Sequence, residues 1–445
     1  MNTVFHLFEN NAEYQNYVET NYSEPFVGAI QTGEDEYEVK YNSTYYKYVK
    51  EPLTFRIQSD GKIFWGILSE GSGNTIEFKK NDGEWSSITG TMIETYSSQI
   101  TIDGKSGTYI YGGFDLEEDA FYWENGSDKV FGAYNYLDVG MTVFDYENEY
   151  EVLSSQYETN GSFIPVVSGD IIQFKGDNPT YGYDDMYHFE SSCGFNIEGN
   201  IMSLINSTGF TTATTLLSSD TFNGLFYGCS NLTDVSKLIL PATTLAEYCY
   251  SSMFYNCTSL TSAPELPATT LANNCYYHMF YGCTSLTTAP ELPATTLANG
   301  CYGYMFNGCT SLTSAPELPA TTLANYCYQY MFWGCTSLTN APELPATTLA
   351  TSCYYYMFQD CTSLTSAPIL PATTLANYCY NSMFYGCTNL NYIKCLATDI
   401  SATNCTRRWV YNVQSNGTFI KNPNMTSWTT GVNGIPTNWT VQDAS

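Results

Sequence analysis

The second half of the chain repeats itself every 26 residues. Each unit reads PATTLAxxCYxxMFxxCTxL followed by a short variable stretch, and its first proline recurs from Pro241 to Pro371. Such a period predicts a solenoid, because each unit can bury its apolar face only against its neighbours. Twelve of the sixteen cysteines occupy the two cysteine positions of the unit: Cys249, Cys275, Cys301, Cys327, Cys353 and Cys379, then Cys257, Cys283, Cys309, Cys335, Cys361 and Cys387.

The pattern degrades at both ends of the array. Upstream, Leu225-Phe226 keeps part of the unit, and downstream Cys405 and Trp409-Val410 take the places of its first cysteine and its Met-Phe pair. A terminal repeat lacks a neighbour on one side, so its apolar face needs a cap. We therefore expect solenoid units over residues 201–390 and a C-terminal cap over residues 391–445.

One short helix is expected in each unit. In the unit that begins at Pro267, apolar residues at spacings of 3, 4, 7, 8 and 11 fit one face of a helix. Thr269-Thr270 suit the N-cap of that helix, and Gly282 suits its end. The stripe consists of Ala272, Cys275, Tyr276, Met279, Phe280 and Cys283.

A short strand is expected after the helix. Leu286, Ala289 and Leu292 can point inward from it, and Pro290 keeps it brief because proline cannot donate to a β ladder. One strand and one helix per 26 residues predict a leucine-rich-repeat type of solenoid. Together with a β-rich first half, this places the chain in the α+β class.

A GCTSLT run that follows three of the Met-Phe pairs resembles a known family. It occurs at 282–287, 308–313 and 334–339, and it is similar to the core of the BspA-type leucine-rich repeat. The resemblance covers about residues 205–390, and the segment 433–441 is similar to the end cap of such arrays. It implies a solenoid that serves as a surface-displayed recognition or adhesion module, without a catalytic site in the repeats.

The first half of the chain is acidic and β-rich. Residues 1–200 hold 34 acidic and 10 basic residues (net −24), against 10 and 5 (net −5) in residues 201–445. Alternating runs at 53–57, 75–78 and 170–174, separated by turn residues, predict antiparallel β structure over residues 51–200. Residues 104–160 fit an insertion or a second small β module. The total charge of −29 argues against a nucleic-acid partner, and no apolar run is long enough for membrane insertion.

Residues 1–50 predict a separate attachment segment. Their expected order of one short helix, a strand, an acidic turn and a second strand is similar to the leading segment of virion proteins in tailed phages, where such an element docks onto the particle. The apolar residues expected to make that attachment are Leu7, Phe8, Tyr14, Tyr17 and Phe26.

The repeated cysteines and glutamates have simple structural interpretations. The cysteines favour small, buried, reduced side chains, because their spacing suits neither a bridge within one helix nor a zinc site. Glu265, Glu291, Glu317 and Glu343 recur in one position, which Ile369 takes in the next unit. They predict a solvated edge or a stripe that recruits cations. We expect no metal site, no cofactor and no catalytic pair of carboxylates.

Aromatic residues outside the buried stripe are the candidate ligand-binding residues. The tyrosine after each first cysteine, from Tyr250 to Tyr380, is expected to be structural. Other aromatic positions differ from unit to unit, and tyrosine and tryptophan suit stacking on sugars or contacts with proteins. The selected residues are Tyr255, Tyr281, Trp333, Tyr385, Tyr277 and Tyr330.

These features predict a non-enzymatic phage virion protein, of the head fibre or tail fibre kind. It would be assembled in the host cytoplasm, since no secretory signal is evident, and it would bind other virion proteins, capsid or tail, through residues 1–50. We expect a homo-oligomer, often a trimer in such appendages, whose repeats bind a host-surface glycan or protein. The alternative is a bacterial cell-surface adhesin of the BspA-like class. A third class, a carbohydrate-active enzyme with its site in residues 51–200, also remains open.

Overall fold

The computed structural model describes residues 50–67, 72–92, 162–178 and 188–444, together with the backbone of short strands elsewhere among residues 4–159. Backbone pairing within residues 4–159 defines small sheets, whose orders are β1-β2-β3, β12-β11-β10-β9, β13-β14 and β15-β8. The strands are β1 (Val4–Phe8), β2 (Phe26–Gln31), β3 (Tyr37–Asn42), β8 (Glu94–Thr95), β9 (Gln99–Ile102), β10 (Lys105–Tyr111), β11 (Phe121–Asn125), β12 (Asp128–Gly132), β13 (Thr142–Phe144), β14 (Glu149–Glu151) and β15 (Glu158–Thr159).

The helix expected near the N-terminus is wrong where the structure describes it. Leu7 and Phe8 lie in β1, which pairs in parallel with β2, so their backbone groups enter a sheet. Phe26 begins β2, and β2 pairs with β3 in an antiparallel hairpin, as the two expected strands require. Tyr14 and Tyr17 lie outside the described residues. The attachment role of this segment therefore remains a prediction.

A nine-stranded sheet precedes the repeats. It follows the order β16-β5-β7-β6-β17-β4-β19-β20, with β18 paired to β5. Most of its pairs are antiparallel. The runs expected as strands at 53–57 and 75–78 lie within β4 and β6, and the run at 170–174 lies in β17 except for Asp170, which comes just before the strand. The strands are β4 (Leu53–Ile57), β5 (Gly61–Ile67), β6 (Ser72–Lys80), β7 (Ser86–Met92), β16 (Phe163–Val166), β17 (Ile171–Lys175), β18 (His188–Ser191), β19 (Phe195–Asn200) and β20 (Leu232–Ile239).

This sheet shares one apolar core with the repeats. β19 pairs antiparallel with β4 on one side and parallel with β20 on the other, and β20 is the first long strand of the repeat region. Phe189 of the sheet stacks on Phe226 at 5.8 Å between ring centroids, and Phe226 stacks on Phe254 of the first full repeat at 5.5 Å. The sheet therefore covers the first coil of the solenoid, as an N-terminal cap must.

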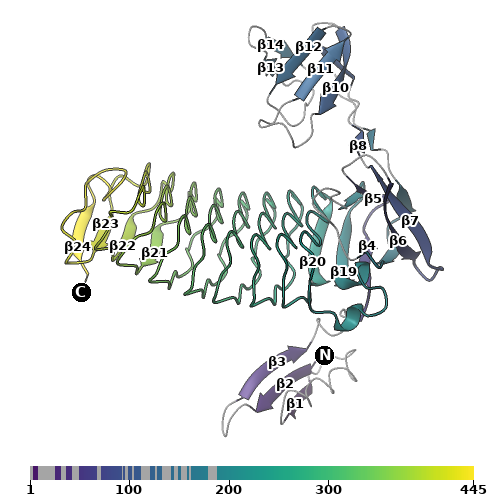
Figure 1. Cartoon of the computed structure of the whole chain (residues 1–445), viewed down its shortest axis with the longest axis horizontal. Coiled ribbons are helices and arrows are strands. Elements are labelled where there is room, and N and C mark those ends of the chain that lie inside the picture. The colour runs from purple at the N-terminus through teal and green to yellow at the C-terminus, as the bar shows by residue number, and fades with distance from the viewer. Residues whose placement is uncertain are drawn as a thin grey trace.

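The repeat region is a stack of 26-residue coils, which Figure 1 shows side by side between β20 and β24. The expected helices are absent: the described residues contain only two short 3-10 helices, η1 (Ile201–Leu204) and η2 (Phe210–Thr212), and neither can span a membrane. The segment from Ala272 to Cys283 is instead a series of four-residue turns. We call the segment of each coil that corresponds to residues 273–283 the turn ribbon.

Backbone hydrogen bonds explain why the turn ribbon is not an α-helix. In the coil of residues 274–283, the amides of Tyr277 and Met279 donate three residues back, to Asn274 and Tyr276. The alternating amides donate to the next coil, as His278 does to the carbonyl of Gly303. Every fourth residue has a positive φ: Asn274 (53°), His278 (58°) and Gly282 (68°). An α-helix permits neither that conformation nor donation to another coil.

The inward face fits four-residue turns as well as it fits a helix. The pairs Cys275-Tyr276 and Met279-Phe280 are fully buried, and they lie four residues apart. An α-helix has 3.6 residues per turn and these turns have four. Because the two periods differ little over three turns, the spacing of apolar residues alone could not distinguish the two structures. The third positive-φ position does carry a signal, because it holds only Gly, Asn or Asp, the residues most tolerant of that conformation: Gly228, Asn256, Gly282, Gly308, Gly334, Asp360, Gly386 and Asn412.

The opposite side of each coil is extended but forms few strands. In the central coils, pairing shrinks to single parallel bridges such as Thr288 to Ser314 and Ser314 to Asn340, as the repeated prolines predict. Longer parallel strands return towards the C-terminus. They form a sheet of β21 (Ser366–Leu370), β22 (Tyr392–Cys395), β23 (Thr418–Lys421) and β24 (Thr440–Asp443).

Aromatic ladders fill the interior. The ring of Phe306 stacks on Phe280 and on Phe332 at 5.7 Å each, with interplanar angles of 1° and 6°. A second ladder contains the tyrosines expected to be structural, which are buried and stacked at about 6 Å from Tyr250 to Tyr380. Trp409 extends this ladder at 6.2 Å from Tyr380, and Trp428 stacks on Trp409 at 5.6 Å.

The cysteines are buried, free thiols, as expected from their spacing. The second cysteine of each unit also serves as a donor across coils: the Cys309 Sγ–H donates to the carbonyl of Phe280 at 3.1 Å, and Cys335 donates to Phe306 at the same distance. Burial raises the pKa of the Cys275 and Cys327 thiols to about 12, which keeps them protonated at neutral pH. A buried, protonated thiol is a poor nucleophile, so these cysteines are structural.

Candidate functional site

The turn ribbon places outward side chains of successive coils in register. We define three outer positions by the residues that hold them in one coil: Tyr277 (first), His278 (second) and Tyr281 (third). Backbone hydrogen bonds between coils fix the register. The N–H of each residue in the second position donates to the carbonyl of the first-position residue in the next coil, as His278 does to Gly303. The first position is Ser251, Tyr277, Gly303, Gln329, Tyr355, Asn381 and Arg407, the second is Ser252, His278, Tyr304, Tyr330, Tyr356, Ser382 and Arg408, and the third is Tyr255, Tyr281, Asn307, Trp333, Gln359, Tyr385 and Tyr411.

The second outer position carries a stack of tyrosines in the central coils. Tyr304, Tyr330 and Tyr356 stack at 4.3 and 4.9 Å, with interplanar angles of 13° and 15°. Burial raises the pKa of the Tyr304 and Tyr330 hydroxyls. Tyr355 from the first position packs edge-on against Tyr330 at 5.3 Å and against Tyr356 at 4.4 Å between ring centroids. The coils thus present a row of neighbouring phenol side chains.

His278 precedes this stack and lies among aromatic rings. Its imidazole is 4.6 Å from the Tyr304 ring and 4.1 Å from Tyr277, and it contacts Tyr281 edge-on at 5.3 Å. Burial lowers the pKa of His278 to about 4, so the imidazole is neutral at pH 7. It therefore adds a polar but uncharged edge to the aromatic surface.

Tyr277 lies flat over a glycine of the next coil. A Cβ added to Gly303 would sit 2.8 Å from two carbon atoms of the Tyr277 ring, so only glycine lets the ring occupy this place. Gly303 is buried beneath it. At the first outer position, the Tyr277 ring therefore occupies space that a side chain at Gly303 would otherwise fill.

The third outer position is a tyrosine stack with two interruptions. Tyr255 and Tyr281 are parallel at 4.5 Å, and further along Tyr385 stacks on Tyr411 at 4.7 Å. Between them lies Trp333, whose neighbours in this position are Asn307 and Gln359. Amides thus take the place of rings on both sides of the indole.

Polar atoms beside the indole are only partly satisfied. The Trp333 Nε1–H donates to the Asp360 carboxylate at 3.1 Å, and the Gln359 Nε2–H donates to the same oxygen at 3.1 Å. In contrast, Asn307 Nδ2 and Gln359 Oε1 are buried and have no hydrogen-bond partner. Asn307 is only 6% exposed. Each unmet group costs roughly 1–3 kcal/mol, because water is lost without replacement.

The structure brings four of the six selected aromatics into one surface. Tyr277 and Tyr281 meet around His278, and Tyr330 contacts Trp333 at 5.5 Å. Tyr255 extends the surface at one end, whereas Tyr385 lies apart, beyond Gln359. Because each stacked ring covers its neighbour, these side chains present mainly edges and hydroxyls rather than open faces. We call the set of Tyr277, His278, Tyr281, Tyr304, Tyr330, Trp333, Tyr355 and Tyr356 the aromatic face.

Sequence reasoning did not select His278, Tyr304, Tyr355 and Tyr356, although they share positions with residues that it did select. It also passed over Arg407 and Arg408, which continue the first and second outer positions into the last coil. The available signal was the fixed 26-residue offset. Extending the outer positions by 26 residues into the C-terminal segment, where the inward pattern is no longer kept, would have selected both arginines.

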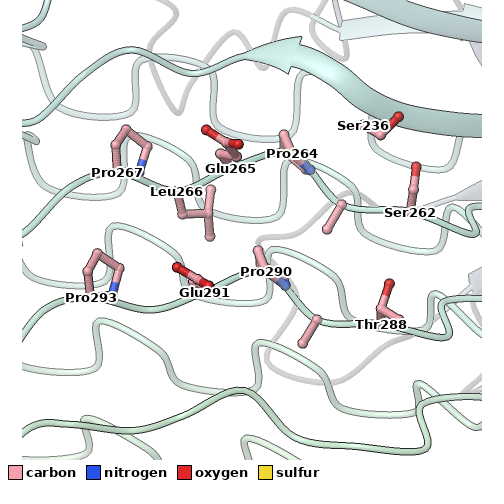
Figure 2. Close-up of a pocket in the computed structure, with 12 residues that line it drawn as sticks. Ser236, Ser262, Pro264, Glu265, Leu266, Pro267, Thr288, Pro290, Glu291 and Pro293 are labelled. Atoms are coloured by element: carbon pink, nitrogen blue, oxygen red, sulfur yellow. The ribbon is translucent and has the colours of Figure 1, made fainter. Parts of the chain in front are cut away.

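The repeated glutamates lie on the extended side of the coils, outside the turn ribbon. Figure 2 shows Glu265 and Glu291 pointing to the same side from adjacent coils, each between two prolines. They border a hollow of about 490 Å³ that Ser262 and Thr288 also line. The carboxylates are exposed, as the solvated edge predicts, and Ile369 is exposed in the same position. No group of metal-ligating side chains is present among the residues that the structure describes.

Comparison with known proteins identifies the repeats. Residues 206–330 and 276–406 match the profile of the BspA type leucine rich repeat region, in six copies. The solenoid is a BspA-type repeat region. No curated protein and no solved structure matches the chain. The BspA-type match favours the surface adhesin alternative over the phage virion protein expected first, for which neither the fold nor the comparisons give support. Repeats of this type are typically non-catalytic.

Proposed function

We propose that this BspA-type protein is a non-enzymatic recognition module of a bacterial cell surface, and that the aromatic face is its binding surface. The observation that carries this proposal is the contrast between the inside and the outside of the coils. Inward residues repeat almost unchanged because packing requires them. The outer residues change from coil to coil, and at the first and second outer positions the rings gather in the central coils.

The end coils lack this concentration of rings. The first and second outer positions hold Ser251 and Ser252 in the first coil, and Asn381 and Ser382 near the end of the array. Packing does not require rings at these positions, since serine fills them in the same backbone. A contiguous patch of half-exposed aromatic rings on one face is typical of a ligand or protein contact surface.

Unmet polar groups beside Trp333 support a ligand rich in hydroxyls. Asn307 Nδ2 is a donor without an acceptor, and Gln359 Oε1 is an acceptor without a donor. Two different hydroxyls of a glycan, one on each side of the indole, can accept from Asn307 and donate to Gln359 once the two amides turn towards the surface. The phenol hydroxyls of Tyr304 and Tyr330 lie on the same side of the coils and can also pair with a glycan. Particle attachment through residues 1–50 and assembly into a trimer are not needed for this function.

Replacing Trp333 and Tyr281 together with alanine is expected to weaken binding to glycans at least tenfold, because the indole and the free edge of the tyrosine stack are both lost. The measurement is binding to an array of neutral and acidic glycans. Phe163→Ala is the control, since Phe163 is an exposed aromatic residue of β16, outside the turn ribbon. Unchanged binding by the double variant, with the control also unchanged, would remove the aromatic face as the binding surface.

A further inference from the structure

A pair of arginines lies two coils beyond the last rings of the aromatic face. Arg407 and Arg408 hold the first and second outer positions of the last coil, because Ser382 donates its backbone N–H to the carbonyl of Arg407 as Tyr356 does to Asn381 one coil earlier. Both side chains are exposed. The chain has only one other arginine, Arg56, which lies in β4.

Neither arginine is neutralised by the protein. Among the described residues, no carboxylate lies within ion-pair distance of either guanidinium, whereas Arg56 pairs with Glu198 and Lys421 pairs with Asp443. Two adjacent, unpaired guanidinium groups in a protein of net charge −29 therefore form a local cationic site.

The coil between the rings and the arginines carries short side chains. Asn381 and Ser382 hold its first and second outer positions and are only 3% and 1% exposed, so they lie below the larger side chains on either side. Tyr355 and Tyr356 flank them from the preceding coil. Two coil steps separate these tyrosines from the arginines, and one step measures 5.8 Å between Phe358 and Phe384 in the interior. This span suits an oligosaccharide rather than a single sugar.

We infer that the face from Tyr277 to Arg408 binds an acidic glycan along the solenoid axis, with Arg407 and Arg408 holding a sugar carboxylate. This inference rests on the proposed function, and it adds the ligand class and the direction of binding. The guanidinium fork matches a carboxylate with two parallel hydrogen bonds. The uncharged tyrosine hydroxyls, Trp333 and its flanking amides then contact the sugar rings. Uronic and sialic acids share this carboxylate, so both are potential sources.

The test compares an acidic oligosaccharide with its uncharged ester, with a second sugar acid and with an acidic polypeptide. Wild-type protein is titrated with oligogalacturonate, with the same oligomer as its methyl ester, with sialyllactose and with poly-glutamate. We expect oligogalacturonate or sialyllactose to bind at least tenfold more tightly than the methyl ester. The acid that binds more tightly identifies the source. Equal binding of the acid and the ester, or binding of poly-glutamate as tight as that of either sugar acid, would overturn the inference.

Variants assign the effect to the arginines. Arg407→Gln with Arg408→Gln is expected to remove the preference for the acid and its sensitivity to salt, while Arg→Lys at both positions retains part of it because the charge remains without the fork. Lys394→Gln is the control, as it removes a cation in β22. If the arginine variant binds like wild type while the variant of Trp333 and Tyr281 does not, this inference fails and the proposed function stands. If neither variant loses binding, both fail.

Discussion

Removal of one whole coil is expected to leave the protein folded, whereas removal of half a coil is expected to unfold the repeat region. Deleting residues 303–328 joins Tyr302 to Gln329, so the new coil keeps the cysteine and tyrosine of one unit and the Met-Phe pair of the next in register. Deleting residues 303–315 instead joins Tyr302 to Pro316. That coil loses Met305 and Phe306, and it leaves Tyr302 and Tyr328 only 13 residues apart, half of the repeat length, so neither aromatic ladder keeps its register.

The reason is that each coil contacts only its two neighbours. Inter-coil hydrogen bonds and stacked rings repeat at the same offset along the array, so a coil can be removed as a unit. Thermal unfolding by circular dichroism and thiol counting give the readout. The whole-coil variant should unfold cooperatively and protect fourteen thiols, which is sixteen without Cys309 and Cys327. Similar behaviour of the two deletions would show that the coils are not interchangeable units.

Replacing Phe306 with alanine is expected to lower the free energy of unfolding by about 3–5 kcal/mol. The ring is fully buried, and it is stacked on both faces by Phe280 and Phe332, so its loss leaves a cavity between two coils that the ladder cannot close. Urea unfolding measures the change.

Two further variants make the Phe306 result specific. Phe306→Leu retains most of the side-chain volume and should cost clearly less than the alanine variant. Thr321→Ala changes an exposed residue of the next unit and should change the free energy by no more than about 0.5 kcal/mol. A cost below about 1 kcal/mol for Phe306→Ala would contradict the packed ladder.

The interior of the solenoid could be predicted from sequence because burial dictates it. The inward Cys-Tyr and Met-Phe pairs, the reduced cysteines and the cap residue Trp409 all follow from which side chains repeat. The α+β class could not be confirmed, because the stripe from Ala272 to Cys283 satisfies a helix and a ribbon of turns alike. The two structures differ in the acceptors of the backbone amides. In the turn ribbon, alternate amides donate to the adjacent coil, and the spacing of residues within one unit does not show this.

The candidate site could be predicted in part. Tyr277, Tyr281, Tyr330 and Trp333 were found because their positions vary while the rest of the unit repeats. Their stacking was not foreseen, because it depends on the distance between coils rather than on residue type. Arg407 and Arg408 were missed because the inward residues of their coil depart from the repeat pattern. The outer positions of that coil still follow the 26-residue offset.

Thiol accessibility tests the central claim, a stack of coils with its cysteines inside, most directly. All sixteen cysteines are buried and free, and burial raises their pKa values, for example to about 12 for Cys395. The folded protein should therefore react hardly at all with a chromogenic disulfide reagent at pH 8. After unfolding in guanidinium chloride without added reductant, it should react through sixteen thiols per chain. Rapid reaction of the folded protein, or fewer than sixteen thiols after unfolding, would contradict the stacked interior.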